Sequence, residues 1–216
     1  VEISVDGQPW EVAIGGDGTV WFTEKAGNKI GKLVPATGAI TEYSVPTANA
    51  QPTGIAIDGD NLWFTESAAN KLGWMDTRTG LGSEFNIPTA GGSPQDVALS
   101  GIGNPWLTES GGNKIALFRA STIQDMHEIP VATAASEPFG IAMEGEHAVW
   151  FTERAGNRLG RYDGNRPPFE YSLPTPRSLP SSVAIDDAGC AWYSAPPVNQ
   201  IGRLCLFRQH LPLVVR

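Results

Sequence analysis

Short apolar segments alternate with clusters of Gly, Asn and Asp along the whole chain, and the alternation is clearest in the second fifth of the sequence. Apolar or alternating runs cover residues 54–57, 62–66, 71–75 and 83–88, with turn-forming residues between them. Runs of this length, bounded in this way, are typical of β-strands joined by tight turns. The pattern therefore predicts an antiparallel sheet of four short strands.

The same pattern recurs through the chain, marked by a phrase that reads Trp-Phe-Thr-Glu in its commonest form. Its five copies begin at Trp21, Trp63, Trp106, Trp150 and Trp192, at intervals of 42, 43, 44 and 42 residues. A repeat of about 40–45 residues that is rich in short strands predicts the blades of a β-propeller. We therefore expect an all-β fold of five four-stranded antiparallel blades.

The two ends of the chain predict how such a ring closes. Residues 2–5 resemble the fourth-strand segment at 42–45, whereas the last repeat ends at its third strand, residues 201–204. We therefore expect the N-terminal strand to join the last blade and complete it. This gives a single propeller domain over residues 1–208 and a C-terminal tail over 209–216. The alternative is that the tail occupies the same edge.

Composition excludes several functional classes. The chain of 216 residues has 15 basic and 23 acidic residues, which gives a formal net charge of −8. A nucleic-acid surface needs a basic patch, so nucleic acid is not an expected partner. The sequence has no run of about 18 apolar residues, so no membrane span is expected.

Cys190 and Cys205 both belong to the last repeat. If Glu24 faces Lys29 across the hairpin of the first repeat, the same register makes the two cysteines cross-strand neighbours. That spacing allows either a disulfide or two buried free thiols. A disulfide would place the protein outside the cytoplasm, and we expect it to be secreted or otherwise extracytoplasmic.

Repeated polar residues invite a functional interpretation, but a structural one accounts for them. The Glu that ends each phrase is followed five residues later by a base. The pairs are Glu24 with Lys29, Glu66 with Lys71, Glu109 with Lys114 and Glu153 with Arg158. In the last repeat both members change, to Ala195 and Gln200, which predicts cross-strand ion pairs rather than a metal or acid-catalytic ring. The Asn that precedes each base is expected to form a left-handed turn.

Longer phrases accompany this core of the repeat. Gly-Asn-Lys/Arg-Ile/Leu-Gly follows Trp-Phe-Thr-Glu, and Glu-Tyr-Ser-Val/Leu-Pro-Thr and Pro-x-Gly-Ile-Ala come after it. In this combination, which covers essentially the whole chain, the sequence resembles the streptogramin lyases (virginiamycin B lyase family). The resemblance implies a β-propeller, seven-bladed in that family. It also implies a Mg²⁺-dependent C–O lyase that linearises streptogramin B-type cyclic depsipeptides by elimination at the ester.

The resemblance breaks at the catalytic histidines, which in that family follow a proline at the entrance to the innermost strand. Here the corresponding residues are Trp10, Thr53, Gln95, Phe139 and Ser181. Glu137, in Glu-Pro-Phe-Gly, matches a carboxylate of the family's site and is a weak catalytic candidate. The histidines that do occur, His127, His147 and His210, are expected on the surface. Without imidazole, acid–base catalysis near neutral pH lacks its usual agent.

The positions after the prolines are expected to ring one mouth of the central channel. The predicted ligand-binding residues are Trp10, Glu11, Asp96, Glu137, Phe139, Ser181 and Ser182. Aromatic walls with hydroxyls and carboxylates suit a sugar, a peptide or a cationic group. The alternative is that Trp10 and Phe139 plug a narrow channel.

These features predict a ligand- or protein-binding propeller whose partner at the channel mouth is a small molecule, glycan or peptide. A divergent lyase, which would need Mg²⁺, and a purely structural domain are the alternatives. No other cofactor is expected. A glycosidase would need paired carboxylates at the channel, and the spacing of the acidic residues in the sequence does not require such pairs.

Overall fold

β-Strands make up nearly all the regular structure of this chain. The computed structural model describes residues 2–119, 125–146, 148–164 and 167–206. His147, His210 and the predicted tail over 209–216 lie outside the described residues. In the described part of the chain, no helix has the length and apolar character that a membrane crossing requires.

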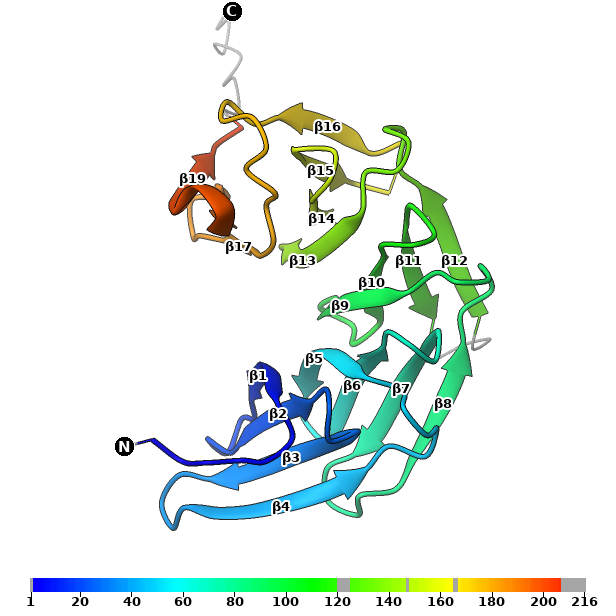
Figure 1. Cartoon of the computed structure of the whole chain (residues 1–216), viewed down its shortest axis with the longest axis vertical. Helices are drawn as coiled ribbons and strands as arrows, with labels where there is room; N and C mark the ends of the chain where they lie inside the picture. The colour runs from blue at the N-terminus through cyan, green and yellow to red at the C-terminus, as the bar shows by residue number, and fades with distance from the viewer. Residues whose placement is uncertain (1, 120–124, 147, 165–166, 207–216) are drawn as a thin grey trace, which may run out of the picture.

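The strands form five antiparallel sheets that follow one another in chain order (Figure 1). The first sheet has β1 (Pro9–Ile14), β2 (Val20–Glu24), β3 (Lys29–Val34) and β4 (Ala39–Ser44). The second has β5 (Pro52–Asp58), β6 (Asn61–Glu66), β7 (Lys71–Asp76) and β8 (Gly82–Asn86). The third has β9 (Pro94–Leu99), β10 (Pro105–Glu109), β11 (Lys114–Arg119) and β12 (Asp125–Pro130).

The fourth sheet has β13 (Pro138–Glu144), β14 (Ala148–Glu153), β15 (Arg158–Tyr162) and β16 (Phe169–Ser172). The fifth has three strands, β17 (Val183–Ile185), β18 (Ala191–Ala195) and β19 (Gln200–Leu204), with a short 3₁₀ turn, η1 (Pro196–Val198), before the last. The four strands predicted for the second repeat are confirmed, with boundaries within three residues of those expected.

Packing within a sheet explains the Gly that lies two residues after the base in the first, second and fourth repeats, where the residue opposite it is a Phe. Gly73 on β7 lies opposite Phe64 on β6, and a Cβ atom added to Gly73 would stand 2.2 Å from the Phe64 ring. The ring therefore lies flat over the neighbouring strand, where only a glycine leaves room for it.

The turn between the second and third strands also behaves as predicted. Asn28 has a φ of 55°, in the left-handed region. Its side-chain amide donates to the carbonyl oxygen of Thr47 at 2.9 Å, and its carbonyl oxygen accepts from the Ala50 N–H at 2.7 Å. The asparagine therefore forms its own turn and also holds the segment that leads to the next sheet.

The core lies between successive sheets, which stand side by side in an arc with the first strand of each on the inside (Figure 1). Four apolar clusters fill the four junctions. In the first of them, Trp21 and Ile30 of the first sheet pack against Ile55 and Phe64 of the second. This stacking of antiparallel sheets around a centre is the arrangement of a β-propeller.

Ring closure does not occur as predicted. Residues 2–5 form no strand, and the fifth sheet has three strands rather than four. Among the described residues, none of the apolar clusters joins the fifth sheet to the first, and the arc is open between them (Figure 1). Residues 2–5 resemble a fourth strand only in a short alternation of polar and apolar residues. Such an alternation does not specify which strand they would pair with.

The predicted ion pairs also need correction. Glu24 and Lys29 are cross-strand neighbours, as expected, but the Lys29 ammonium pairs with Glu42 on the outer strand β4. The same outer pairing joins Lys71 to Glu84 at 2.7 Å and Arg158 to Glu170 at 3.2 Å. The glutamates of the second strands are buried, and a basic side chain that paired with them there would lose its hydration. The basic side chains therefore point outward, to the glutamates of the outer strands.

Cys190 and Cys205 form a disulfide, which decides between the two states that the sequence left open. The bond joins the segment before β18 to the end of β19, as the cross-strand register predicted, and the two Cα atoms are 4.3 Å apart.

Replacing both cysteines with serine should lower the free energy of unfolding by about 3 kcal/mol, because the bond closes a loop of 15 residues. Urea unfolding of the oxidised protein and of the double variant measures the difference. An unchanged unfolding midpoint would contradict the prediction.

Candidate functional site

One cavity of about 110 Å³ lies where the starts of β1, β9 and β13 meet the segment that leads into β17. Its lining residues are Trp10, Glu11, Gln95, Asp96, Phe139, Gly140, Ser181 and Ser182. We call this cavity the mouth pocket. It brings together six of the seven residues predicted to bind a ligand, all except Glu137. Gln95 and Gly140 are additions, and they stand at the repeat positions of Trp10 and Glu11, so repeat alignment identifies them.

Other candidates from the sequence lie away from the mouth pocket. Glu137 is exposed, and its backbone carbonyl accepts from the Arg154 N–H at 3.0 Å. Thr53 is fully buried and its hydroxyl is 2.9 Å from that of Thr65. His127 is exposed on β12, an outer strand. Neither Glu137 nor His127 therefore lines this site.

Two carboxyl groups occupy the floor of the mouth pocket and are held by backbone N–H groups of neighbouring sheets. Glu11 on β1 accepts from the Ile55 N–H of β5 at 3.2 Å. Asp96 on β9 accepts from the Val97 N–H at 2.7 Å and, with its other oxygen, from the Ile141 N–H of β13 at 2.8 Å. Each carboxyl group thus reaches from its own sheet to the next one along the chain.

Glycine in the intervening sheet makes this reach possible. Gly54 on β5 lies between Glu11 on β1 and Asp96 on β9 in the row of inner strands. A Cβ atom added to Gly54 would lie 2.5 Å from the Asp96 Cα atom. The small residues near the starts of the inner strands allow these strands to converge tightly. It brings acidic residues from the first and third sheets into contact across the second.

Electrostatics distinguishes the two carboxyl groups. Burial raises the pKa of Glu11 far above its usual range, and the neighbouring Asp96 carboxylate raises it further. Burial also raises the pKa of Asp96, but less, because the N–H groups of Ile141 and Val97 favour its ionised form. Near neutral pH the pair therefore holds one proton, on Glu11, beside an ionised Asp96.

Aromatic rings form two walls of the mouth pocket, and each ring is covered by a cation. The Lys25 ammonium lies 4.0 Å from the Trp10 ring centre, and the Arg154 guanidinium lies 5.1 Å from that of Phe139. Lys25 and Arg154 hold the same repeat position, just after the buried glutamate. Where the position after the proline is polar, at Thr53, Gln95 and Ser181, the corresponding residue is uncharged: it is Ser67, Ser110 and Pro196 respectively. The aromatic residue and its cation therefore change together.

Hydroxyl groups complete the lining. The Ser181 and Ser194 hydroxyls are 2.9 Å apart, and the Ser182 N–H donates to the Ser194 oxygen at 3.2 Å. The Gln95 side-chain amide donates to the Ser93 carbonyl oxygen at 3.1 Å, so it is fixed in place. The mouth pocket therefore offers hydrogen-bonding groups of two kinds: neutral hydroxyl and amide groups, and the carboxyl groups of Glu11 and Asp96.

Mg²⁺ does not fit this set of donors. Among the described residues no three His, Cys, Asp or Glu side chains are grouped to hold a metal ion. The mouth pocket has two carboxyl groups, one of them protonated, and both Asp96 oxygens already accept backbone N–H bonds. A magnesium ion takes several oxygen ligands in octahedral geometry, which these groups do not supply.

The buried glutamates at the ends of the second strands are a separate set and belong to the scaffold. Glu109 is completely buried, and no described residue supplies a hydrogen-bond partner to either of its oxygens. Its carboxyl group packs against the backbone of Gly92 and Gly112. Burial and the nearby Glu128 raise its pKa to about 7, against the opposing effect of Lys114.

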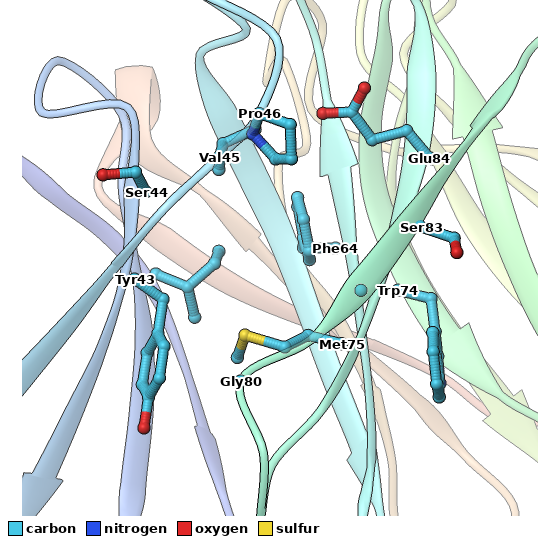
Figure 2. Close-up of a pocket in the computed structure, with 12 residues that line it drawn as sticks. Tyr43, Ser44, Val45, Pro46, Phe64, Trp74, Met75, Gly80, Ser83 and Glu84 are labelled. Carbon is cyan, nitrogen blue, oxygen red and sulfur yellow. The ribbon is translucent and has the colours of Figure 1, made fainter.

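Two further cavities lie between the first and second sheets. One, of about 50 Å³, is an apolar groove where the Met75 side chain reaches toward Tyr43 (Figure 2). At the next junction Phe118 stands in the place of Met75, and its ring centre is 4.6 Å from that of Phe85. The groove is therefore a packing gap left by the thinner methionine.

The other cavity is polar and occupies about 220 Å³ where the β1–β2 turn meets the β5–β6 turn. Of its two acidic residues, Asp17 accepts from the N–H and hydroxyl of Thr19, at 3.0 and 2.6 Å, and Asp60 pairs with Arg78 at 3.3 Å. The Lys32 ammonium lies 5.0 Å from the Trp21 ring centre. These contacts, all within the protein, account for the charged residues of the cavity without a ligand.

Comparison with known proteins shows which family and which solved structures this chain resembles. The model of the virginiamycin B lyase family matches residues 3–144 and 118–209. The structure of virginiamycin B lyase from Staphylococcus aureus is similar, with 33% sequence identity and a TM-score of 0.87, over 94% of this chain and 68% of that one. A search of curated proteins found no match.

Two related structures are also similar. A catalytically inactive His-to-Ala variant of the Staphylococcus aureus enzyme with quinupristin gives the same identity, TM-score and coverage. A streptogramin B lyase structure gives 30% identity and a TM-score of 0.85, over 94% of this chain and 67% of that one.

The buried glutamates predict a pH dependence of stability. The pKa of Glu109 is about 7 in the folded chain and near 4.5 when unfolded, so the folded state binds the proton more tightly. The stabilisation is complete below pH 4.5 and is lost as the pH rises through 7. The melting temperature should therefore fall between about pH 5 and pH 8, and Glu109→Gln should make the fall shallower.

Glu109→Ala separates charge from packing in this experiment, because it leaves a cavity and should destabilise the chain at every pH. Differential scanning calorimetry across the pH range measures all three proteins. A melting temperature that rises from pH 5 to pH 8 would contradict the account.

Proposed function

Because the chain belongs to the virginiamycin B lyase family, we propose that it binds a small polar ligand at the mouth pocket, on that family's scaffold but without its histidines. The observation that carries this proposal is the pair of Glu11 and Asp96, which sits between the aromatic walls of Trp10 and Phe139.

The chemistry of the mouth pocket favours a ligand with hydroxyl or amide groups. A protonated Glu11 donates and an ionised Asp96 accepts, while Ser181 and Ser182 do either. Aromatic walls bind the flat, apolar faces of sugars and peptide side chains. A glycan unit or a short peptide therefore fits better than a simple cation, because the rings of Trp10 and Phe139 already carry cations.

A channel plug made by the two aromatic residues is less well supported. Trp10 is 51% exposed, and a cavity remains beside it and Phe139. A plug would bury its two rings against one another across the channel. In the described part of the chain, the rings of Trp10 and Phe139 are not a contacting aromatic pair. The exposed half of Trp10 is instead available to a ligand.

The disulfide supports an extracytoplasmic location, because such bonds persist mainly in oxidising compartments. A ligand from outside the cell, such as a glycan fragment or a peptide, agrees with that location. We include a secreted or otherwise extracytoplasmic site of action in the proposal.

Lyase activity is the second candidate, and the similarity to streptogramin lyases favours it. In that case the carboxyl pair would replace imidazole. Asp96 would take the proton from the carbon adjacent to the one that carries the ester oxygen, a C=C bond would form as the alkyl C–O bond breaks, and Glu11 would protonate the leaving carboxylate. The product would be a linear peptide of unchanged mass. Glu137, exposed and outside the mouth pocket, would have no part in this step.

Binding should depend on the charge of Asp96 and on the aromatic walls. With a panel of monosaccharides, N-acetylated sugars and dipeptides as probes, Trp10→Ala combined with Phe139→Ala should weaken any binding by roughly tenfold or more. Asp96→Asn should also weaken it, whereas Glu11→Gln keeps a neutral donor and should retain most of it. Saturation-transfer NMR and calorimetry measure these effects.

Phe169→Ala is the matched control, because it removes the same ring from the outer strand β16. It should leave the affinity unchanged. If the double aromatic variant binds as well as the parent, the mouth pocket is not the binding site.

Lyase activity is tested separately with quinupristin and Mg²⁺, followed by chromatography and mass spectrometry. We expect quinupristin to remain cyclic, because the mouth pocket has neither histidine nor a magnesium ligand set. A linear product of the same mass, lost in Asp96→Asn, would replace the binding proposal with the lyase.

A further inference from the structure

Glu109 is a buried ionisable group that the proposed binding chemistry does not use. It ends β10, its side chain is completely buried, and among the described residues neither of its carboxyl oxygens has a hydrogen-bond partner. A carboxylate in such a place loses its hydration and gains no hydrogen bond in return. The arrangement therefore suits the protonated form, and an ionised Glu109 requires water to reach it.

The loop of residues 89–93, which we call the cover loop, lies over this carboxyl group. A Cβ atom added to Gly92 would stand 3.0 Å from the Glu109 Oε2 atom, and one added to Gly112 in the β10–β11 turn would stand 2.8 Å from it. The Gly92 carbonyl oxygen accepts from the Gly111 N–H at 2.9 Å and so joins the loop to that turn. Glycine backbone of two segments thus lies against the carboxyl group, and water reaches it only when one of these segments moves.

Two charged side chains act on Glu109, and both already have partners. The Lys114 ammonium of β11 pairs with the Glu128 carboxylate of β12 and donates to the Thr89 hydroxyl. Glu128 also accepts from the Thr89 N–H at 2.8 Å. The cover loop and the β10–β11 turn add only uncharged residues, over 89–93 and 110–113. Burial and Glu128 outweigh the opposing effect of Lys114, so the pKa of Glu109 is raised to about 7.

The cover loop leads directly into the mouth pocket. It ends at Ser93, whose φ of 49° is left-handed although Pro94 follows, a combination that costs free energy because of steric crowding. The Gln95 side-chain amide donates to the Ser93 carbonyl oxygen and to the Ser93 hydroxyl, both at 3.1 Å. Gln95 and Asp96 line the mouth pocket. Movement of the cover loop therefore releases Gln95 and shifts the start of β9, which carries Asp96.

We propose that Glu109 is a pH-sensitive switch for the mouth pocket. While Glu109 is protonated, the cover loop stays closed over it and fixes Gln95 and Asp96. Once Glu109 is ionised, it draws in water, the cover loop opens, and this side of the mouth pocket loses its fixed geometry. The effect on affinity rests on the proposed function, whereas the movement of the loop depends on no ligand.

The direction of the switch follows from the linkage between proton binding and loop closure. The closed form binds the proton more tightly than an open form in which water reaches the carboxyl group, because closure raises the pKa of Glu109. The closed form is therefore favoured at low pH and is lost as the pH rises through about 7. The mouth pocket should be ordered in mildly acidic solution and should loosen in mildly alkaline solution.

Glu66 offers a matched control within the same fold. It is also completely buried, with both oxygens unpartnered among the described residues, and burial and Glu84 raise its pKa to about 7. The loop beside it, which accepts from the Ala68 N–H at 3.0 Å through the Ala50 carbonyl oxygen, leads instead to Thr53. Thr53 is fully buried and is not part of the mouth pocket lining. Glu66→Gln therefore removes the same kind of proton site and leaves the cover loop alone.

Hydrogen exchange followed by NMR tests the switch without a ligand, with each amide's rate divided by its intrinsic rate at the same pH. The Gly92 N–H donates to the Thr89 carbonyl oxygen at 3.1 Å, and the Ser93 N–H donates to the Asn70 side chain at 3.1 Å, so both report closure of the cover loop.

In the parent and in Glu66→Gln, the protection of these two amides should fall roughly tenfold from pH 6 to pH 8. In Glu109→Gln, which has no proton to lose, the protection should stay constant. A parent whose protection does not change with pH would overturn the proposal, and so would an equal loss of protection in Glu109→Gln.

Circular dichroism shows whether each variant is folded. If Glu109→Gln does not fold, the parent alone decides the matter: a carboxyl-¹³C titration of Glu109 must have the same midpoint as the loss of protection in the cover loop. Separate midpoints would overturn the switch.

Binding is measured by calorimetry at pH 6.5 and pH 8, with N-acetylglucosamine and glycylphenylalanine as probes. The affinity of the parent and of Glu66→Gln should fall roughly tenfold between these values, and that of Glu109→Gln should fall much less. An equal fall in Glu109→Gln would contradict the switch. If neither probe binds the parent at either pH, the proposed function fails for both ligand classes, and the exchange measurement still decides whether the switch exists.

Discussion

Burial of the sheet faces that meet at the four junctions is the constraint on which this structure depends. A four-stranded sheet of short strands has two apolar faces and little stability of its own. Trp21 and Ile30 supply one face of the first junction and Ile55 and Phe64 the other, and the pattern repeats three times. The Thr of each repeated phrase adds a buried hydroxyl that bonds a carbonyl oxygen of the next sheet. Stability therefore lies between the sheets more than within them.

The same stacking creates the mouth pocket. Because the inner strands converge, the residues that begin them stand close together, and glycines at Gly54 and Gly140 let the backbones approach. Acidic residues of the first and third sheets then lie near enough to share a proton, although 85 residues separate them in sequence. A scaffold that is built by repetition thus brings together the positions at which the repeats differ.

Repetition also explains which features the sequence could predict. The five repeats, the strands, the left-handed Asn turns and the register that pairs Cys190 with Cys205 are local properties, and each was predicted. The predicted ring closure was wrong, because the angle between sheets depends on packing across junctions rather than on any single strand. The ion pairs were assigned to Glu24 instead of Glu42, because both lie opposite or near Lys29 and burial decides between them. Most residues of the mouth pocket were predicted, but the shared proton is a consequence of burial and distance.

The central claim is that Glu11 and Asp96 hold one proton between them near neutral pH, since the ligand chemistry follows from that pair. Carboxyl-¹³C NMR, with the two resonances assigned through Glu11→Gln and Asp96→Asn, measures the protonation of each group across a pH titration. The account predicts that Glu11 remains protonated at pH 7 while Asp96 is ionised. Two independent titrations near pH 4, the usual range of exposed carboxyl groups, would contradict it.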